Sequence, residues 1–323
     1  MTAMTTLQWA RLSDRLFDAA VLTYLVAMVG YAIYLGFRTN AVWAAARAVT
    51  VVGLGMHLAS IVARTVAAGR VPWGNMWEFS SLLAFLVVLG YLVIVEGVYK
   101  VRTLGAFALI FSAVTMGVAR IFGFYVAPGP LVPALNSYWL KIHVLAAIVG
   151  SSLYALGGGV LTVLYLVKAA AERREAAALG SRPVPPVMGA SQDLADPPHF
   201  VAGADDPVGE TSARRRRGVL PPSAVLDRMA YRTIAVGFPI WTFAVIAGAV
   251  WAQEAWGRYW GWDPKETWAF ITWVIYAGYL HARATSGWKG TRAAVVALVG
   301  FASLLVTYYA VNLFIVSLHG YAK

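Results

Sequence analysis

The residues best suited to chemistry lie in one aromatic stretch, residues 251–268, which reads WAQEAWGRYWGWDPKETW and holds five of the 13 tryptophans. Gly257 and Gly261 separate the aromatic side chains and allow tight backbone conformations. The charged residues within the aromatic core of the stretch are Arg258, Asp263, Lys265 and Glu266. A flat apolar surface edged by fixed charges suits a flat apolar ligand that carries charged substituents. An aromatic belt at the membrane interface is the alternative, but such belts are distributed over many helix ends.

The end of this stretch also carries the signals that start a helix. Asp263 is suited to the N-cap position and Pro264 to the first helical position, while Glu266 would lie near the positive end of the helix. A structural role and a binding role are therefore both open for Asp263 and Glu266.

The elements that must position this stretch are membrane helices. The chain has 323 residues, of which 60% are hydrophobic and 13% charged, which is more apolar than a soluble domain. Its apolar runs reach the roughly 20 residues that a helix needs to cross the hydrocarbon core. We therefore predict an all-α polytopic integral membrane protein with about eight transmembrane helices and an outer tryptophan-rich loop. The predicted spans cover residues 16–36, 44–66, 79–99, 103–121, 140–167, 232–252, 266–284 and 293–316.

Residues 169–230 differ from the rest of the chain, because they hold eight of the 14 prolines and eight acidic residues. Such a composition predicts a largely disordered loop. It divides the chain into an N-terminal membrane half, residues 1–168 with about five spans, and a C-terminal membrane half, residues 231–323 with about three. His199 falls in this loop and is expected to be a solvated side chain.

Basic residues in the loops predict the orientation. Four consecutive arginines at 214–217 lie in the long loop, and short loops at the same end carry Arg38, Lys100 and Arg102. This end is predicted to face the cytoplasm. With eight spans, both termini and residues 251–268 then lie on the outer face of the cell membrane. The net charge of +11 therefore reflects topology rather than nucleic-acid binding.

Four histidines fall at two depths. His143, at the start of the fifth span, and His319, after the last span, are predicted on the outer face with the aromatic stretch. His57 and His281 lie inside spans, where ionisable side chains are costly and indicate function. A neutral imidazole offers one nitrogen lone pair to a metal while its other nitrogen donates a hydrogen bond. Whether His57 and His281 share one ligand stays open. The chain has no cysteine, which excludes thiolate metal sites and dithiol chemistry by this chain.

Residues 256–266, WGRYWGWDPKE, closely resemble the tryptophan-rich "WWD" signature of haem-handling membrane proteins. The continuation TWAF resembles the CcsA or ResC family of cytochrome c biogenesis proteins, some members of which are called CcsB. The resemblance covers the chain apart from residues 169–230. Further matching residues are Pro72, Asn75, Glu78, residues 138–143 and residues 318–321, where Gly320-Tyr321 replaces an expected Ser-Tyr pair.

The resemblance implies haem b as the cofactor. At the outer site, His143 and His319 would be axial ligands of the haem iron, and His57 with His281 would form a transmembrane haem site. Arg258 and Lys265 are both candidates for the haem propionates, by charge alone. The implied haem platform consists of Trp256, Gly257, Arg258, Tyr259, Trp260, Trp262, Asp263, Pro264, Lys265 and Glu266.

The resemblance also implies a function: the membrane subunit of the two-component cytochrome c assembly system, within a holocytochrome c synthase complex. Such a subunit binds haem, delivers it to the outer face and positions it for thioether attachment to the CXXCH motif of apocytochrome c. The implied partners are apocytochrome c, a membrane subunit of the ResB type with a large outer domain and, indirectly, a thiol-reducing pathway.

Two other functions stay open. The first is a haem exporter or holder that passes haem to a separate chaperone without synthase activity; the eight predicted spans favour the synthase subunit over it. The second is a transporter of a small solute, which lacks support because the sequence shows no internal repeat and no charge relay within the spans.

Overall fold

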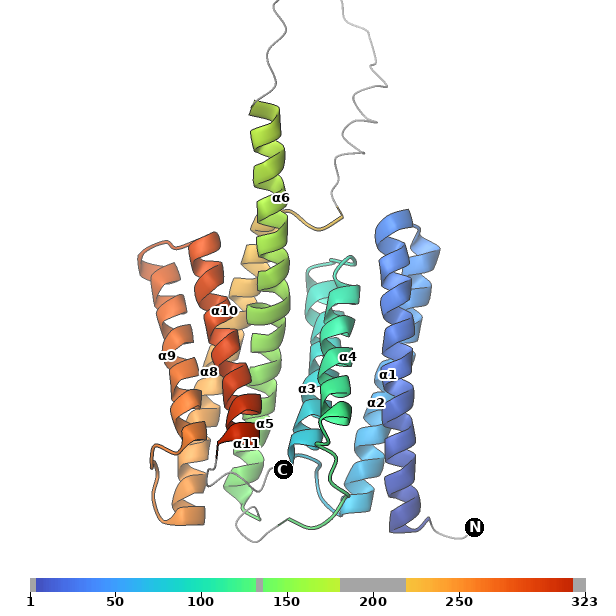
Figure 1. Ribbon diagram of the computed structural model, residues 1–323, viewed down its shortest axis with the longest axis vertical. Helices are drawn as coiled ribbons and strands as arrows, with labels where there is room; N and C mark the ends of the chain where they lie inside the picture. The colour runs from blue at the N-terminus through green and yellow to red at the C-terminus, as the bar shows by residue number, and fades with distance from the viewer. Residues whose placement is uncertain (1–3, 132–135, 181–218, 316–323) are drawn as a thin grey trace, which may run out of the picture.

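The computed structural model describes residues 4–131, 136–180 and 219–315, and its long helices run side by side along one axis (Figure 1). Every regular element within these ranges is helical, which confirms the predicted all-α class. The α-helices are α1 (Thr6–Phe37), α2 (Asn40–Ala68), α3 (Met76–Gly90), α4 (Gly105–Ile121), α5 (Tyr138–Tyr154), α6 (Thr162–Gly180), α8 (Ser223–Trp256), α9 (Pro264–Thr285), α10 (Thr291–Leu305) and α11 (Val311–Phe314).

Segments of π-helix extend or join several of these helices. The segment η1 (Tyr91–Val98) continues α3, η3 (Ala155–Leu161) joins α5 to α6, and η4 (Val306–Ala310) joins α10 to α11. A π-helical turn changes the direction in which the following side chains point and frequently occurs at functional sites. Of the three, η4 contributes side chains to the site described below.

The helices have the length and composition of membrane spans. Six helical segments among the described residues are long and apolar enough to cross a membrane: α1, α2, α3 with η1, α5 through α6, α8, and α10 through α11. The apolar helix α4 is shorter, and α9 runs beside the others over 22 residues (Figure 1). The protein is therefore a multi-pass membrane protein, whereas the number of eight crossings stays a prediction.

The bundle has two chemically different ends. One end holds residues 69–75, 122–131 and 257–263, and we call it the tryptophan end. The opposite end, which we call the basic end, holds residues 38–39, 99–104 and 286–290 together with the end of α6 (Figure 1).

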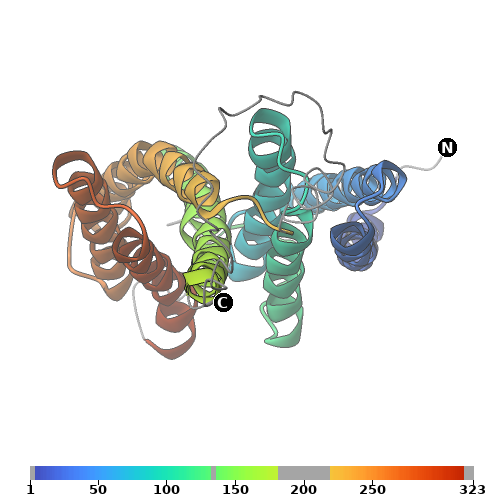
Figure 2. The same cartoon turned by 90° about the horizontal axis from the view of Figure 1, so that it is seen from above.

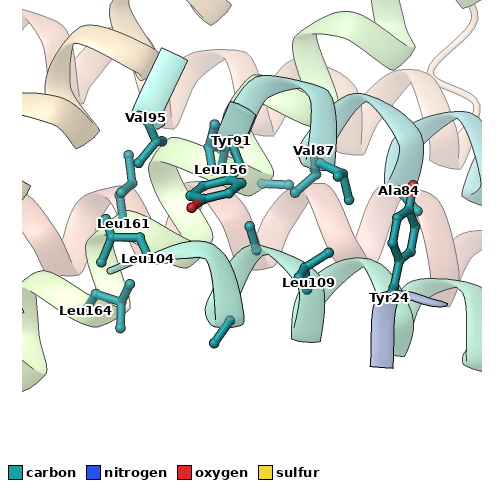
Figure 3. Packing of buried hydrophobic residues seen from close by; sticks show 14 of the residues in the cluster. Tyr24, Ala84, Val87, Tyr91, Val95, Leu104, Leu109, Leu156, Leu161 and Leu164 are labelled. Atoms are coloured by element: carbon teal, nitrogen blue, oxygen red, sulfur yellow. The ribbon is translucent and has the colours of Figure 1, made fainter. Parts of the chain in front are cut away.

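Within the described part of the chain, three clusters of buried side chains hold the helices together. The largest cluster extends from α1 to α6 and also includes residues of α8 and α10; Tyr24, Tyr91, Leu109 and Leu156 are among its members (Figure 3). A second cluster surrounds Tyr154, Trp241 and Tyr276 on α5, α8 and α9. A third and smaller one joins Leu140 on α5 to Trp251 on α8. Viewed from above, α1 and α2 lie on one side of the molecule and α9 on the other (Figure 2). The helices of the second membrane half therefore pack mainly against α5, η3 and α6, and α5 in turn packs against α3.

The described structure differs at both ends from the predicted disordered loop, residues 169–230. Helix α6 continues to Gly180, because residues 169–180 are rich in the good helix formers Ala, Glu and Arg. Helix α8 begins at Ser223, whose backbone N–H and hydroxyl both donate to the Glu172 carboxylate, at 3.2 and 2.5 Å. Residues 181–218, which include His199, lie outside the described residues.

Close helix packing depends on Gly158 within η3. A Cβ atom at this position would overlap the Tyr276 hydroxyl and lie 3.3 Å from the Ala297 carbonyl oxygen. We expect Gly158→Ala to destabilise the protein by about 1–3 kcal/mol, because overpacking displaces neighbouring groups. Gly278→Ala is the matched control, since a Cβ on that exposed glycine meets nothing within 4 Å and alanine favours helix. Thermal unfolding of the purified protein should show a lower midpoint for the first variant alone; equal midpoints would contradict this account of the packing.

Candidate functional site

A cavity of about 200 Å³ opens at the tryptophan end, between α3, α5, α8, α9 and η4. Both membrane halves therefore contribute to it. Its wall is mainly aromatic and apolar, with a few polar groups, which is the usual composition of a site for an organic ligand. The residues that line it include Trp73, Asn75, His143, Trp256, Tyr259, Trp260, Lys265, Glu266 and Tyr308.

His143 lies near the start of α5 and faces this cavity. Its Nδ1 is 2.8 Å from the carbonyl oxygen of Ala244 on α8. A carbonyl oxygen can only accept, so Nδ1 carries the proton and the lone pair of the neutral ring is on Nε2. Such a second hydrogen bond is the arrangement that orients metal-binding histidines.

The His143 ring packs closely against helix α8. The ring lies parallel to that of Trp251, with centroids 6.1 Å apart and an interplanar angle of 11°. On the neighbouring turn, a Cβ atom on Gly248 would come within 2.8 Å of the ring. Only glycine at this position lets α8 approach the imidazole so closely, so the orientation of the ring is set by the packing of α5 against α8.

The loop between α8 and α9 begins and ends at specific caps. Gly257 ends α8 in the left-handed conformation, with φ of 72°. Asp263 caps α9 by accepting from the Lys265 N–H at 3.1 Å, and Glu266 Oε2 accepts from the Asp263 N–H at 3.2 Å and the Gly261 N–H at 2.8 Å. With Pro264 at the first position, this confirms the helix start predicted from the sequence.

The aromatic side chains of the loop point in two directions, some towards the cavity and one towards the outside. Trp256, Tyr259 and Trp260 line the cavity. Trp262 is not among the lining residues: its side chain is largely exposed, and its ring packs edge-on against Trp260 and Phe270. Its backbone is left-handed, with φ of 58°, a conformation that costs energy for any residue except glycine. The predicted platform is therefore divided between the cavity and the outside of the loop.

The charged residues of the loop are sorted in the same way. Lys265 and Glu266 line the cavity, whereas Arg258 does not. Lys265 precedes the predicted span 266–284, and burial lowers the pKa of its ammonium group to about 8, against the opposing effect of the Asp263 charge. Glu266 has one oxygen, Oε1, that is buried without a hydrogen-bond partner among the described residues.

A buried carboxylate holds the opposite wall of the cavity. Glu78, in the first turn of α3, accepts from Arg64 Nε at 2.9 Å, from Arg70 Nη1 at 2.8 Å and from the Gly74 N–H at 2.8 Å. Asn75 caps the same helix by accepting from the Glu78 N–H at 2.9 Å. These contacts fix residues 73–76, all four of which line the cavity.

The two arginines also bind the segment that leads towards α5. Arg64 Nη2 donates to the Val126 carbonyl oxygen at 2.5 Å, and Arg70 Nε donates to that of Gly129 at 2.9 Å. In the sequence, Asn75 and Glu78 stand out only through the family resemblance, and no signal points to either arginine. Their spacing, 14 and 8 residues from Glu78, gives no periodic signal that links them to it.

Tyr308 forms a third side of the cavity and was also missed. Its hydroxyl donates to the Met76 carbonyl oxygen at 2.6 Å and lies 2.8 Å from Ser80 Oγ. Its ring stacks on Phe79, with centroids 4.4 Å apart. In the sequence, Tyr308 falls within an apolar span and is indistinguishable from a packing residue; the π-helical segment η4 carries it.

The structure does not bring His57 and His281 together. His57 is fully buried among α1, α2 and α3, with Nδ1 3.2 Å from the Tyr24 hydroxyl and Nε2 3.0 Å from Ser81 Oγ. His281 is exposed on α9, and α2 and α9 lie on opposite sides of the bundle (Figures 1 and 2). His319, the predicted partner of His143, lies outside the described residues.

A family model and several known proteins match this chain, and all of them are described as cytochrome c assembly or biogenesis proteins. A family model described as "Cytochrome C assembly protein" matches residues 73–319. The chain is 35% identical over 286 residues to the cytochrome c biogenesis protein CcsA of Gloeobacter violaceus, covering 81% of each chain. It is 33% identical over 329 residues to the CcsA of a Synechocystis species, covering 94% of this chain and 96% of the relative.

A solved structure shares the fold. The structure titled "Cytochrome c Heme Lyase CcmF" superposes with a TM-score of 0.60 at 15% sequence identity. The match covers 96% of this chain but 47% of that one, so the chain spans about half of its length. At this identity the likeness concerns the fold alone.

Substitution of Glu78 tests the buried network. We expect Glu78→Gln to destabilise the protein by about 3–5 kcal/mol, because it leaves two arginines in the interior without their counter-charge. Asp18→Asn is the matched control: it breaks the Arg120–Asp18 pair, whose side chains are each 47% exposed, and should cost less than about 1 kcal/mol. Thermal unfolding measures both. Similar shifts in the two variants would show that Glu78 does not hold the structure as described.

Proposed function

Because the chain belongs to the cytochrome c assembly protein family, we propose that it binds haem in the cavity at the tryptophan end and presents it to apocytochrome c. A role in cytochrome c maturation follows from the family. The proposal adds the cofactor, haem b, the site and the way in which the residues of this chain act on it. The cavity suits this group because, among the described residues, its lining combines aromatic side chains with the histidine His143 and the cation Lys265.

The observation that carries the proposal is the hydrogen bond between His143 Nδ1 and the Ala244 carbonyl oxygen. It fixes the tautomer that has its lone pair on Nε2, the atom that coordinates haem iron in a histidine-ligated site. The packing against Gly248 and Trp251 fixes the orientation of the ring. We propose His143 as one axial ligand and His319, the last residue that the family model matches, as the other.

In this proposal the work of the protein is positioning. Trp256 and Trp260 line the cavity, where their rings would pack against a macrocycle and exclude water from one side of it. When bound, haem supplies the vinyl groups to which the two thiols of the apocytochrome CXXCH motif add. The chain has no cysteine, so both thiols belong to the substrate. Holding one reactant in a fixed orientation lowers the entropic part of the barrier.

We also propose that the tryptophan end faces the outside of the cell membrane and that a second membrane subunit, of the ResB type, completes the complex. The basic residues at the opposite end support this orientation. The fully described connections at the tryptophan end, residues 69–75 and 257–263, are too short to enclose an apocytochrome. His281 is exposed on α9, and we propose that a second haem ligand beside it would come from such a subunit.

The proposal predicts haem binding that depends on His143. We expect the purified protein to bind haem with a Soret band typical of histidine ligation, and His143→Ala to weaken this binding by more than about tenfold. His199→Ala is the control, because it removes a histidine from the long predicted loop. Absorption titration with haem measures both variants. Unchanged affinity and an unchanged Soret position in His143→Ala would exclude this residue as the ligand.

A further inference from the structure

The two cations of the α8–α9 loop, Arg258 and Lys265, have different surroundings. The sequence gives no reason to choose between them as the group that recognises a negatively charged part of the ligand. The structure places only Lys265 in the wall of the cavity.

Arg258 is held by the loop itself. Gly257 turns the chain at the end of α8, and the Arg258 guanidinium then lies over Gly261, in the space that a Cβ at that position would occupy. Its contact with the loop backbone explains why position 261 is glycine. Arg258 is therefore a positioning residue that braces the loop.

The backbone of Lys265 takes part in the cap of α9, whereas its side chain lines the cavity. Its backbone N–H donates to Asp263 Oδ1, so that carboxylate serves as the cap of α9. Within the described ranges, no carboxylate oxygen lies within 4 Å of the Lys265 ammonium group. The neighbouring carboxylate, Glu266, already accepts two backbone N–H groups at the positive end of the helix. The cavity wall thus contains an ammonium group that has no close counter-charge from the residues that the structure describes.

From this arrangement we infer that Lys265, and not Arg258, binds a carboxylate group of the ligand held in the cavity. The inference rests on the proposed function, in which that ligand is haem with its two propionate carboxylates. A lysine ammonium acts as a compact point charge on a flexible stem, which suits a carboxylate at the edge of an aromatic site. The contact also fixes which edge of the macrocycle points towards α9, and so which edge is presented outwards.

A comparison of two ligands tests the inference. The full-length protein is titrated with haem and with haem dimethyl ester, which lacks both negative charges, and binding is followed by quenching of tryptophan fluorescence. The wild type should bind haem about tenfold more tightly than the ester, as expected for one charge-assisted contact. Lys265→Met should lower the affinity for haem about tenfold and leave that for the ester unchanged, while Lys265→Arg keeps most of the preference.

Two further variants serve as controls. Lys141→Met removes a positive charge from an exposed position near the start of α5, and Arg258→Met removes the brace. Lys141→Met should behave as the wild type, and Arg258→Met should change both affinities together, so that the preference for haem survives. The inference is overturned if Lys265→Met keeps the preference, if it weakens both ligands equally, or if Arg258→Met abolishes the preference. A wild type that binds haem and its ester equally also overturns it, whereas a wild type that binds neither ligand overturns the proposed function.

Discussion

The shape of the cavity depends on one buried carboxylate, Glu78, which needs hydrogen-bond partners and opposite charges around it. Glu78 is almost inaccessible, and a charge removed from water is tolerated only when opposite charges and hydrogen bonds surround it. Arg64 and Arg70 supply the charges and the Gly74 N–H a further bond. Because each of these groups has to reach the same carboxylate, the end of α2, the connection to α3 and residues 126–129 are held in one arrangement. The wall that carries Trp73 and Asn75 follows from it.

The opposite wall also depends on a glutamate near the capped N-terminus of a helix. In both α3 and α9 a glutamate stands in the first turn, three residues after a capping Asn75 or Asp263. Both helices therefore direct their positive ends towards the cavity, and both glutamates offset part of this field. The two glutamates differ in their partners. Glu78 is paired with two arginines. Glu266 accepts only backbone N–H groups and keeps one oxygen without a partner among the described residues. The first wall is the more rigid scaffold, and the second carries the groups proposed to meet the ligand.

The features that the sequence predicts correctly are those determined by residues close together in the chain. The membrane helices follow from apolar runs, and the start of α9 follows from Asp263, Pro264 and Glu266, which interact within four residues. The meeting of His143 with the aromatic loop follows from helix direction, because each crossing reverses the chain. The partners of Glu78, the cavity position of Tyr308 and the separation of His57 from His281 depend on how helices rotate and pack. Depth along a helix, which the sequence gives, does not determine the direction in which a side chain points. For the same reason, the sequence could not divide the tryptophans between the cavity and the outside.

The loop between α8 and α9 combines features that together keep it in one shape. Gly257 and Trp262 both have positive φ, Arg258 covers Gly261, and Glu266 binds two backbone N–H groups of the loop. Backbone strain at Trp262 persists only because these contacts determine the conformation around it. A loop held in this way presents Tyr259 and Trp260 to the cavity before any ligand arrives, which reduces the ordering cost of binding. Such pre-organisation suits a protein whose proposed task is to hold a flat ligand still while a second protein reacts with it.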